Sequence, residues 1–178
     1  MLESVIADKY RWKDYKHPII LSQFRFIYVK RWCEYYRNRS KVLFLVWRAI
    51  YQRMETKYNM DFPAKVIVGK GLRIEHMGGG VVINPNAILG ENITLLNGVL
   101  IGSQSRGSKK GYPVIGNDVW IGTNAVIVGS IKIGDHVLIA PGAYINFDVP
   151  ECSIVLGNPG KIIHRENATK GYTLNLYE

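Results

Sequence analysis

Aliphatic residues recur at every sixth position through the middle of the chain, between Ile83 and Val149. The main series comprises Ile83, Leu89, Leu95, Ile101, Ile115, Ile121, Ile127, Ile133, Ile139 and Ile145. A second series of Ala, Ile or Val follows four residues behind it. A period of six fits neither an α-helix nor an alternating strand. It is typical of a hexapeptide repeat, in which short strands form stacked coils of a parallel β-helix and each strand points one residue inward.

The repeat extends backwards to about residue 61 in a shifted phase, and it is interrupted twice. One interruption adds three residues within His76–Gly80, and the other adds eight within Ser103–Pro113. Insertions in a solenoid tend to lie on its binding face. We therefore expect functional residues at these two places.

The pattern changes on both sides of the solenoid. Residues 22–37 and 41–58 have helical periodicity, and Ser22 and Ser40 are suitable N-caps. Residues 1–20 predict only a weak helix or an irregular arm. The chain is thus expected to be an all-β solenoid (61–160) with an α-helical hairpin in an N-terminal cap (1–60) and a C-terminal tail (161–178). Such a cap would cover the open edge of the first coil.

The positive charge lies mainly in the predicted cap. The whole chain has a net charge of +9, and residues 1–60 carry 13 Lys/Arg against 5 Asp/Glu, which gives +8. Arg25, Lys30, Arg37 and Arg39 surround the apolar face of the first predicted helix. One interpretation is a surface for an anionic partner such as phospholipid headgroups, and the other is an ordinary solvated face. No nucleic-acid-binding module accompanies the charge, so no nucleic-acid partner is predicted.

Cysteine content and hydropathy indicate the cellular compartment in which the protein is expected. Cys33 and Cys152 form no disulfide or metal-binding pattern, so free thiols in a reducing environment are expected. Neither a signal peptide nor a membrane-spanning segment is predicted. We expect a cytoplasmic protein, with peripheral contact at the inner membrane face if the basic cap meets lipid.

His76 is the strongest candidate for chemistry among the four histidines. It lies at the first interruption, directly before Met77 and three glycines that leave room for a ligand. A neutral imidazole is a suitable general base for a hydroxyl proton. Asp61, fifteen residues earlier, could lie one coil away and orient the ring, whereas Glu75 should leave the opposite face of the strand.

The second interruption is polar and basic, and it predicts a flexible projecting loop. One interpretation is a segment that closes over a ligand, contributed by a neighbouring subunit. The alternative is a disordered surface loop.

Two motifs resemble a known family. The segments Ile115-Gly-Asn-Asp-Val-Trp-Ile-Gly122 and Gly157-Asn-Pro-Gly-Lys161 are similar to those of the left-handed β-helix acyltransferases that use acetyl-CoA. Within that family, the fifteen-residue spacing of Asp61 and His76 and the segment Ile74–Gly79 resemble the serine acetyltransferase branch. The resemblance covers more than half of the chain and implies a left-handed β-helix and a homotrimer with sites between subunits.

The resemblance also implies roles for individual residues. His76 would be the catalytic base and Asp61 the residue that orients it. Backbone N–H groups near Ser103 and Gln104 would stabilise the oxyanion. The remaining implied cofactor contacts are Gly122, Thr123, Ala140 and Pro141 for CoA, with Lys161 or Arg165 assigned to its phosphates from charge alone. No metal is implied.

The departures from the branch concern the acceptor. An Asp of the branch is Glu75 here, and an Arg-His pair before Pro is Gly111-Tyr112. The shortened N-terminal segment resembles acetyltransferases of capsule and exopolysaccharide synthesis. With Glu75 and Tyr112 as acceptor contacts, a sugar hydroxyl is the first expectation. Serine O-acetylation in cysteine biosynthesis is the alternative.

Two other classes share a solenoid of this kind. A zinc enzyme of the carbonic anhydrase type needs three converging histidines, and only His76 and His136 lie within the repeat. A non-catalytic scaffold would lack CoA binding.

Overall fold

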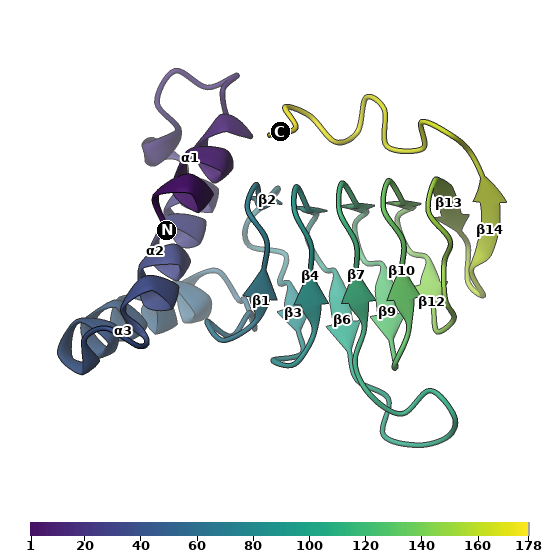
Figure 1. Ribbon diagram of the computed structural model, residues 1–178, viewed down its shortest axis with the longest axis horizontal. Coiled ribbons are helices and arrows are strands. Elements are labelled where there is room, and N and C mark those ends of the chain that lie inside the picture. Colours follow the sequence, from purple (N-terminus) through teal and green to yellow (C-terminus); the bar gives the residue numbers. More distant parts are fainter. Residues whose placement is uncertain (178) are drawn as a thin grey trace.

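A computed structural model describes residues 1–177 and shows a helical group at one end of a solenoid (Figure 1). The helices are α1 (Leu2–Tyr10), the short 3-10 helix η1 (Pro18–Ile20), α2 (Ser22–Tyr36) and α3 (Lys41–Lys57). The predicted hairpin corresponds to α2 and α3, and the N-terminal arm contains a further helix, α1. Within residues 1–177, every helix is too short or too polar to cross a membrane.

The solenoid has three faces of short strands. We name each sheet after one of its strands. The β7 sheet has the strand order β1-β4-β7-β10, the β6 sheet has the order β12-β9-β6-β3, and the β8 sheet has the order β14-β13-β11-β8-β5-β2. The strands are β1 (Ile67–Val68), β2 (Arg73–Ile74), β3 (Val82–Ile83), β4 (Ile88–Leu89), β5 (Thr94–Leu95), β6 (Leu100–Gly102), β7 (Val114–Ile115), β8 (Trp120–Ile121), β9 (Val126–Val128), β10 (Lys132–Ile133), β11 (Leu138–Ile139), β12 (Tyr144–Ile145), β13 (Ser153–Leu156) and β14 (Lys161–His164). All neighbours are parallel except β13 and β14. The predicted β-helix is therefore confirmed.

The hexapeptide positions form the core. Ile83 pairs in register with Ile101, Ile101 with Ile127, and Ile127 with Ile145, so one aliphatic column runs through the β6 sheet. These side chains are buried, while Val82, directly before Ile83, is 41% exposed. Each coil thus removes its repeat residues from water, at roughly 25 cal/mol per Å² of apolar surface.

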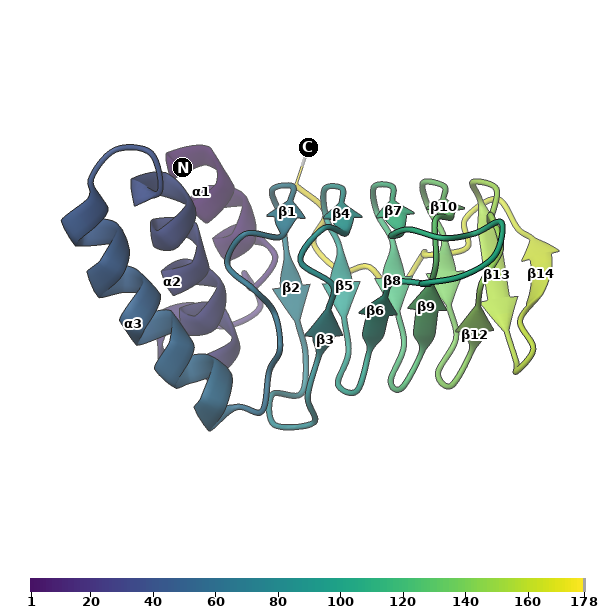
Figure 2. The same ribbon diagram turned by 90° about the horizontal axis from the view of Figure 1, so that it is seen from below.

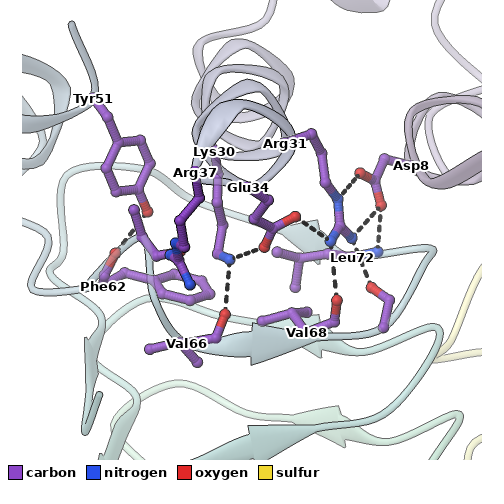
Figure 3. Close-up of polar contacts among 12 residues, drawn as sticks. Asp8, Lys30, Arg31, Glu34, Arg37, Tyr51, Phe62, Val66, Val68 and Leu72 are labelled. Carbon is purple, nitrogen blue, oxygen red and sulfur yellow. Dashed lines mark hydrogen bonds and ion pairs between the residues drawn. The ribbon is translucent and has the colours of Figure 1, made fainter. Parts of the chain in front are cut away.

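The helical group docks on the first coil through buried charged side chains (Figure 3). Arg31 donates to the backbone oxygens of Val68 and Gly69 at 2.9 and 2.6 Å and forms an ion pair with Asp8 at 2.7 Å. Lys30 donates to the Val66 oxygen at 3.0 Å. These oxygens belong to the first coil, which has no preceding coil to pair with. The cap therefore satisfies the open edge, as expected for a solenoid.

Part of the positive charge of the cap is buried, whereas both interpretations of the sequence placed Lys30 on an exposed face. Lys30 is fully buried and Arg31 is 3% exposed. Burial opposes the charge of Arg31, but Asp8 and Glu34 outweigh it, so the pKa of Arg31 is raised. Arg37 also donates to a solenoid oxygen, that of Ala64, at 2.6 Å. Part of the positive charge therefore holds the fold together instead of facing a partner.

The C-terminal tail returns along the outside of the β8 sheet to the helices, so that its end lies near α1 (Figure 1). The Tyr172 ring packs against that of Trp120 with centroids 5.1 Å apart. Arg11, just after α1, donates to the Leu174 oxygen at 2.8 Å, and Asn92 donates to the Tyr177 oxygen at 3.1 Å. The tail thus crosses its own solenoid.

Replacing Arg31 with Ala should lower the free energy of unfolding by about 3–5 kcal/mol, because Asp8 would remain buried without its partner. Urea unfolding followed by circular dichroism measures the loss. Arg25 lies on the same helix and is exposed, so Arg25→Ala serves as the control and should change stability by no more than about 0.5 kcal/mol. Equal losses in the two variants would contradict the docking role of Arg31.

Candidate active site

His76 lies in the turn between β2 and β3, at an exposed position. Its φ of 56° is left-handed, a conformation that His adopts more readily than most side chains. At Gly78 (φ 104°) a Cβ would meet nothing within 4 Å, whereas at Gly79 it would lie 2.5 Å from the Asn97 side chain. The turn therefore combines an exposed imidazole with open space beside it.

Asp61 lies before β1, where the solenoid begins, and it pairs with Val82 at the end of the His76 turn. Its N–H donates to the Val81 oxygen at 2.9 Å, and its oxygen accepts from the Ile83 N–H at 2.8 Å. Both Asp61 and His76 are exposed, and neither a hydrogen bond nor an ion pair links them within residues 1–177. Asp61 thus lies beside the last residues of the His76 turn, and its orienting role stays a prediction.

Glu75 is held by an arginine that the sequence analysis did not single out. The Arg73 Nε donates to Glu75 Oε1 at 2.7 Å, and Arg73 Nη1 donates to the Arg11 oxygen at 2.5 Å. The Arg73 guanidinium also lies 4.5 Å from the centroid of the Trp12 ring. Residues two apart in a strand share a face, so this spacing was the available signal. Part of the Glu75 carboxylate is therefore already neutralised.

The predicted CoA contacts continue from His76 along one edge of the solenoid. We call this edge, formed by the turns that lead from the β8 sheet to the β6 sheet, the His76 edge. Gly122 and Thr123 lie in the turn after β8, and Ala140 and Pro141 in the turn after β11. Residues of successive turns are hydrogen-bonded to each other.

Those bonds fix the spacing of the turns. The Thr123 Oγ1 donates to Asn97 Oδ1 at 3.0 Å, and the Thr123 oxygen accepts from the Gly142 N–H at 2.8 Å. A Cβ at Gly122 would lie 2.6 Å from the Pro141 nitrogen, so only glycine allows this approach. Lys161 is exposed at the start of β14 and follows the turn after β13, where the Gly157 oxygen accepts from the Tyr144 N–H at 3.1 Å, next to the turn after β11. The sequence-predicted donor site thus forms one row.

The remaining predicted residues lie at another edge. Ser103, Gln104 and Tyr112 belong to the loop between β6 and β7, which projects from the solenoid (Figure 1). This loop and the His76 turn flank opposite sides of the β6 sheet, so one chain does not bring Tyr112 to His76. The Gln104 N–H already donates to the Gly111 oxygen at 3.1 Å, so it would have to exchange that bond to serve an oxyanion. The roles of Ser103 and Gln104 stay predictions.

The projecting loop is tied to the solenoid, in contrast to the flexible segment that the sequence suggested. Lys109 Nζ donates to Asp148 Oδ2 at 2.8 Å, and the Lys109 oxygen accepts from the Ser130 N–H at 2.8 Å. The hydrogen bond from Lys109, together with the Lys132 N–H, lowers the pKa of Asp148. The loop therefore keeps a defined direction.

Other titratable groups lie apart from these two edges. His136 lies at a coil corner with its Nδ1 3.5 Å from Asp118 Oδ2. Burial raises the pKa of the Cys33 thiol to about 11, which makes it a poor nucleophile. Over residues 1–177, no three His, Cys, Asp or Glu side chains are grouped so that they could hold a metal ion.

Comparison with known proteins gives consistent matches. Residues 112–146 match the family model "Bacterial transferase hexapeptide (six repeats)". Serine acetyltransferase 4 of Arabidopsis thaliana is 35% identical over 115 residues, which are 65% of this chain and 32% of that protein. Serine acetyltransferase of Bacillus licheniformis is 35% identical over 120 residues, 67% of this chain and 55% of the relative. The chain thus spans about a third to just over half of the length of these curated relatives.

Solved structures match over a larger share. Neisseria gonorrhoeae serine acetyltransferase in complex with serine is 31% identical with a TM-score of 0.74, covering 91% of this chain and 68% of that one. Serine acetyltransferase from Brucella abortus in complex with coenzyme A is 26% identical with a TM-score of 0.75, and the match covers 92% of this chain and 66% of that one. The similarity therefore includes the helical group as well as the solenoid.

Replacing Lys109 with Met should raise the pKa of the Asp148 carboxyl toward its ordinary value of about 3.9, because the charged hydrogen bond is lost. Carboxyl chemical shifts in an NMR pH titration give the midpoint. Lys110→Met removes a neighbouring positive charge without this contact and should leave the midpoint in place. An unchanged midpoint in Lys109→Met would show that the loop is not held by this pair.

Proposed function

The chain belongs to the left-handed β-helix, hexapeptide-repeat acyltransferases, in their serine acetyltransferase-like branch, and on that basis we propose that it transfers an acetyl group from acetyl-CoA to a hydroxyl group. The observation that carries the proposal is the His76 edge. An exposed imidazole lies at the end of a row of close-packed turns that offers a narrow surface for an extended donor. A relative with this fold is described in complex with coenzyme A.

The proposed reaction uses His76 as the general base. The imidazole takes the proton of the acceptor hydroxyl while its oxygen attacks the thioester carbonyl carbon of acetyl-CoA. The C–S bond of the tetrahedral intermediate then breaks, and the CoA sulfur receives the proton from the imidazolium. Asp61 would stabilise the charged imidazole, and backbone N–H groups near Ser103 would stabilise the oxyanion.

Two copies of the chain are needed to complete this site. His76 and Tyr112 lie on opposite sides of the β6 sheet, so the loop that meets a given His76 must come from a neighbouring subunit. The anchored direction of the loop, away from its own coils, suits such a contact (Figure 1). A homotrimer, in which each subunit gives one edge and one loop, would provide equivalent sites between subunits.

L-Serine is the first candidate for the acceptor. The relatives described above are all named serine acetyltransferases, and one of the structures is described in complex with serine. These names give no support to polysaccharide decoration, the first expectation from the sequence. Serine needs partners for an ammonium and a carboxylate. Glu75 could accept from the ammonium, and a cation of the loop, such as Arg106, could meet the carboxylate.

A saccharide hydroxyl remains a second candidate because of two particular observations. Gly111 and Tyr112 replace the Arg-His pair of the branch, and Tyr112 is 44% exposed, which suits stacking on a sugar ring. In addition, the bond from Arg73 leaves Glu75 less able to balance an ammonium. Both features favour an uncharged acceptor.

The test is the release of CoA from acetyl-CoA with L-serine and with a panel of mono- and oligosaccharides in parallel. We expect serine-dependent release at a rate above the hydrolysis seen without acceptor. Release with saccharides only would move the assignment to the second candidate. Absence of CoA binding by calorimetry would overturn the proposed activity altogether.

His76→Asn should reduce turnover by about 10²–10⁴-fold, because it removes the base while Asn tolerates the left-handed backbone. His136→Asn is a matched control, since His136 has a φ of 55° at another solenoid corner. Initial rates of CoA release and thermal unfolding are measured for both variants. Full activity in His76→Asn, or an equal loss in His136→Asn, would remove the assigned base.

A further inference from the structure

The outer face of α3 carries aliphatic side chains that nothing within residues 1–177 covers. These are Val42, Leu43, Leu45, Val46 and Ile50, with exposed fractions of 71%, 41%, 55%, 50% and 38%, and we call them the α3 strip. Five such side chains within ten residues are not the scattered exposure that is normal for a surface. Clustered apolar residues of this kind mark interaction sites.

The strip faces away from the rest of the molecule. The opposite side of α3 packs on the core through Phe44, Trp47 and Tyr51. α3 is the outermost element at its end of the structure, beyond α2 (Figure 2). A shallow groove of about 410 Å³ continues the apolar surface from Ile50 to Ile19, which is 52% exposed. The apolar surface therefore extends beyond a single helix.

The charges around the strip are all positive. Arg39 lies in the turn before α3 and Lys41 at its first position, Arg53 and Lys57 lie in its last turns, and all four are exposed. None of the four forms an ion pair within the described residues. The single acidic residue of α3, Glu55, is turned inward and paired with Arg48 at 3.0 Å. The outer face thus has aliphatic and cationic groups without any carboxylate.

This composition discriminates between possible occupants. A second copy docking through the same face would bring the same cations together, with no acid to offset them. A lipid surface with anionic headgroups meets both requirements, because headgroups balance the cations while the aliphatic side chains enter the acyl boundary. A helix with an apolar side flanked by Lys and Arg is the usual form of such a contact.

We propose that the α3 strip and its four flanking cations dock the protein on an anionic lipid surface, with α3 lying in the plane of the interface. Docking through α3 would place the solenoid on the water side. The proposal does not depend on the acetyl-transfer reaction.

The experiment is co-sedimentation of the full chain with vesicles of phosphatidylcholine containing phosphatidylglycerol, compared with phosphatidylcholine alone. Binding is expected to the anionic vesicles and to weaken as salt is raised. Val42→Ser with Val46→Ser should reduce the partition coefficient by about tenfold or more, because two inserted side chains are lost. Arg53→Gln with Lys57→Gln should also reduce it.

Each double variant has a matched control. Leu2→Ser with Ile6→Ser changes α1 residues that are 71% and 48% exposed, close to the 71% and 50% of Val42 and Val46. Lys132→Gln with Lys170→Gln removes two exposed cations elsewhere. Both controls should bind vesicles as the unchanged protein does.

Three results would overturn the proposal. The first is equal binding to both kinds of vesicle, and the second is undiminished binding by the α3 variants. The third is a fall in the solution mass of Val42→Ser with Val46→Ser by light scattering, which would show that the strip covers another copy of the chain. Circular dichroism of every variant confirms that a loss of binding is not a loss of fold.

Discussion

The carbonyl groups at the open edge of the first coil need hydrogen-bond donors, and the helical group supplies them. Every later coil is paired by its neighbour, but β1 has no strand before it. An unpaired backbone oxygen that is shielded from water costs about 1–3 kcal/mol, and the edge exposes several. Arg31 and Lys30 extend from α2 to these oxygens, and Asp8 and Glu34 balance their charge. The position of the helical group, and hence of α3, follows from this contact.

The fold could be predicted because the pattern of aliphatic residues that specifies it is periodic. One aliphatic residue per six, repeated over many coils, specifies both the strands and their register, since each column of Ile or Leu stacks only when the coils align. The two breaks in the period also identified the His76 turn and the projecting loop. Both are local properties of the sequence.

The contacts that could not be predicted join residues with no fixed spacing. Lys30 reads as a surface residue of a basic helix, and only the arrival of the first coil, whose Val66 oxygen accepts from it, makes its burial favourable. The Arg73–Glu75 pair could have been predicted, because residues two apart in a strand share a face. The contact of the Trp12 ring with the Arg73 guanidinium could not. Similarly, no pattern indicated that the anchor of the loop would be Asp148, more than thirty residues further along the chain.

The tail that runs from β14 back to Arg11 has a consequence for how this solenoid can change in evolution. Repeat proteins commonly gain or lose whole coils by duplication, since each coil contacts only its neighbours. Here the two ends of the stack are bridged by one segment of fixed length. Each added coil would separate them by about 4.8 Å, so the tail would need one or two more residues at the same time. The length of the tail therefore favours the present number of coils.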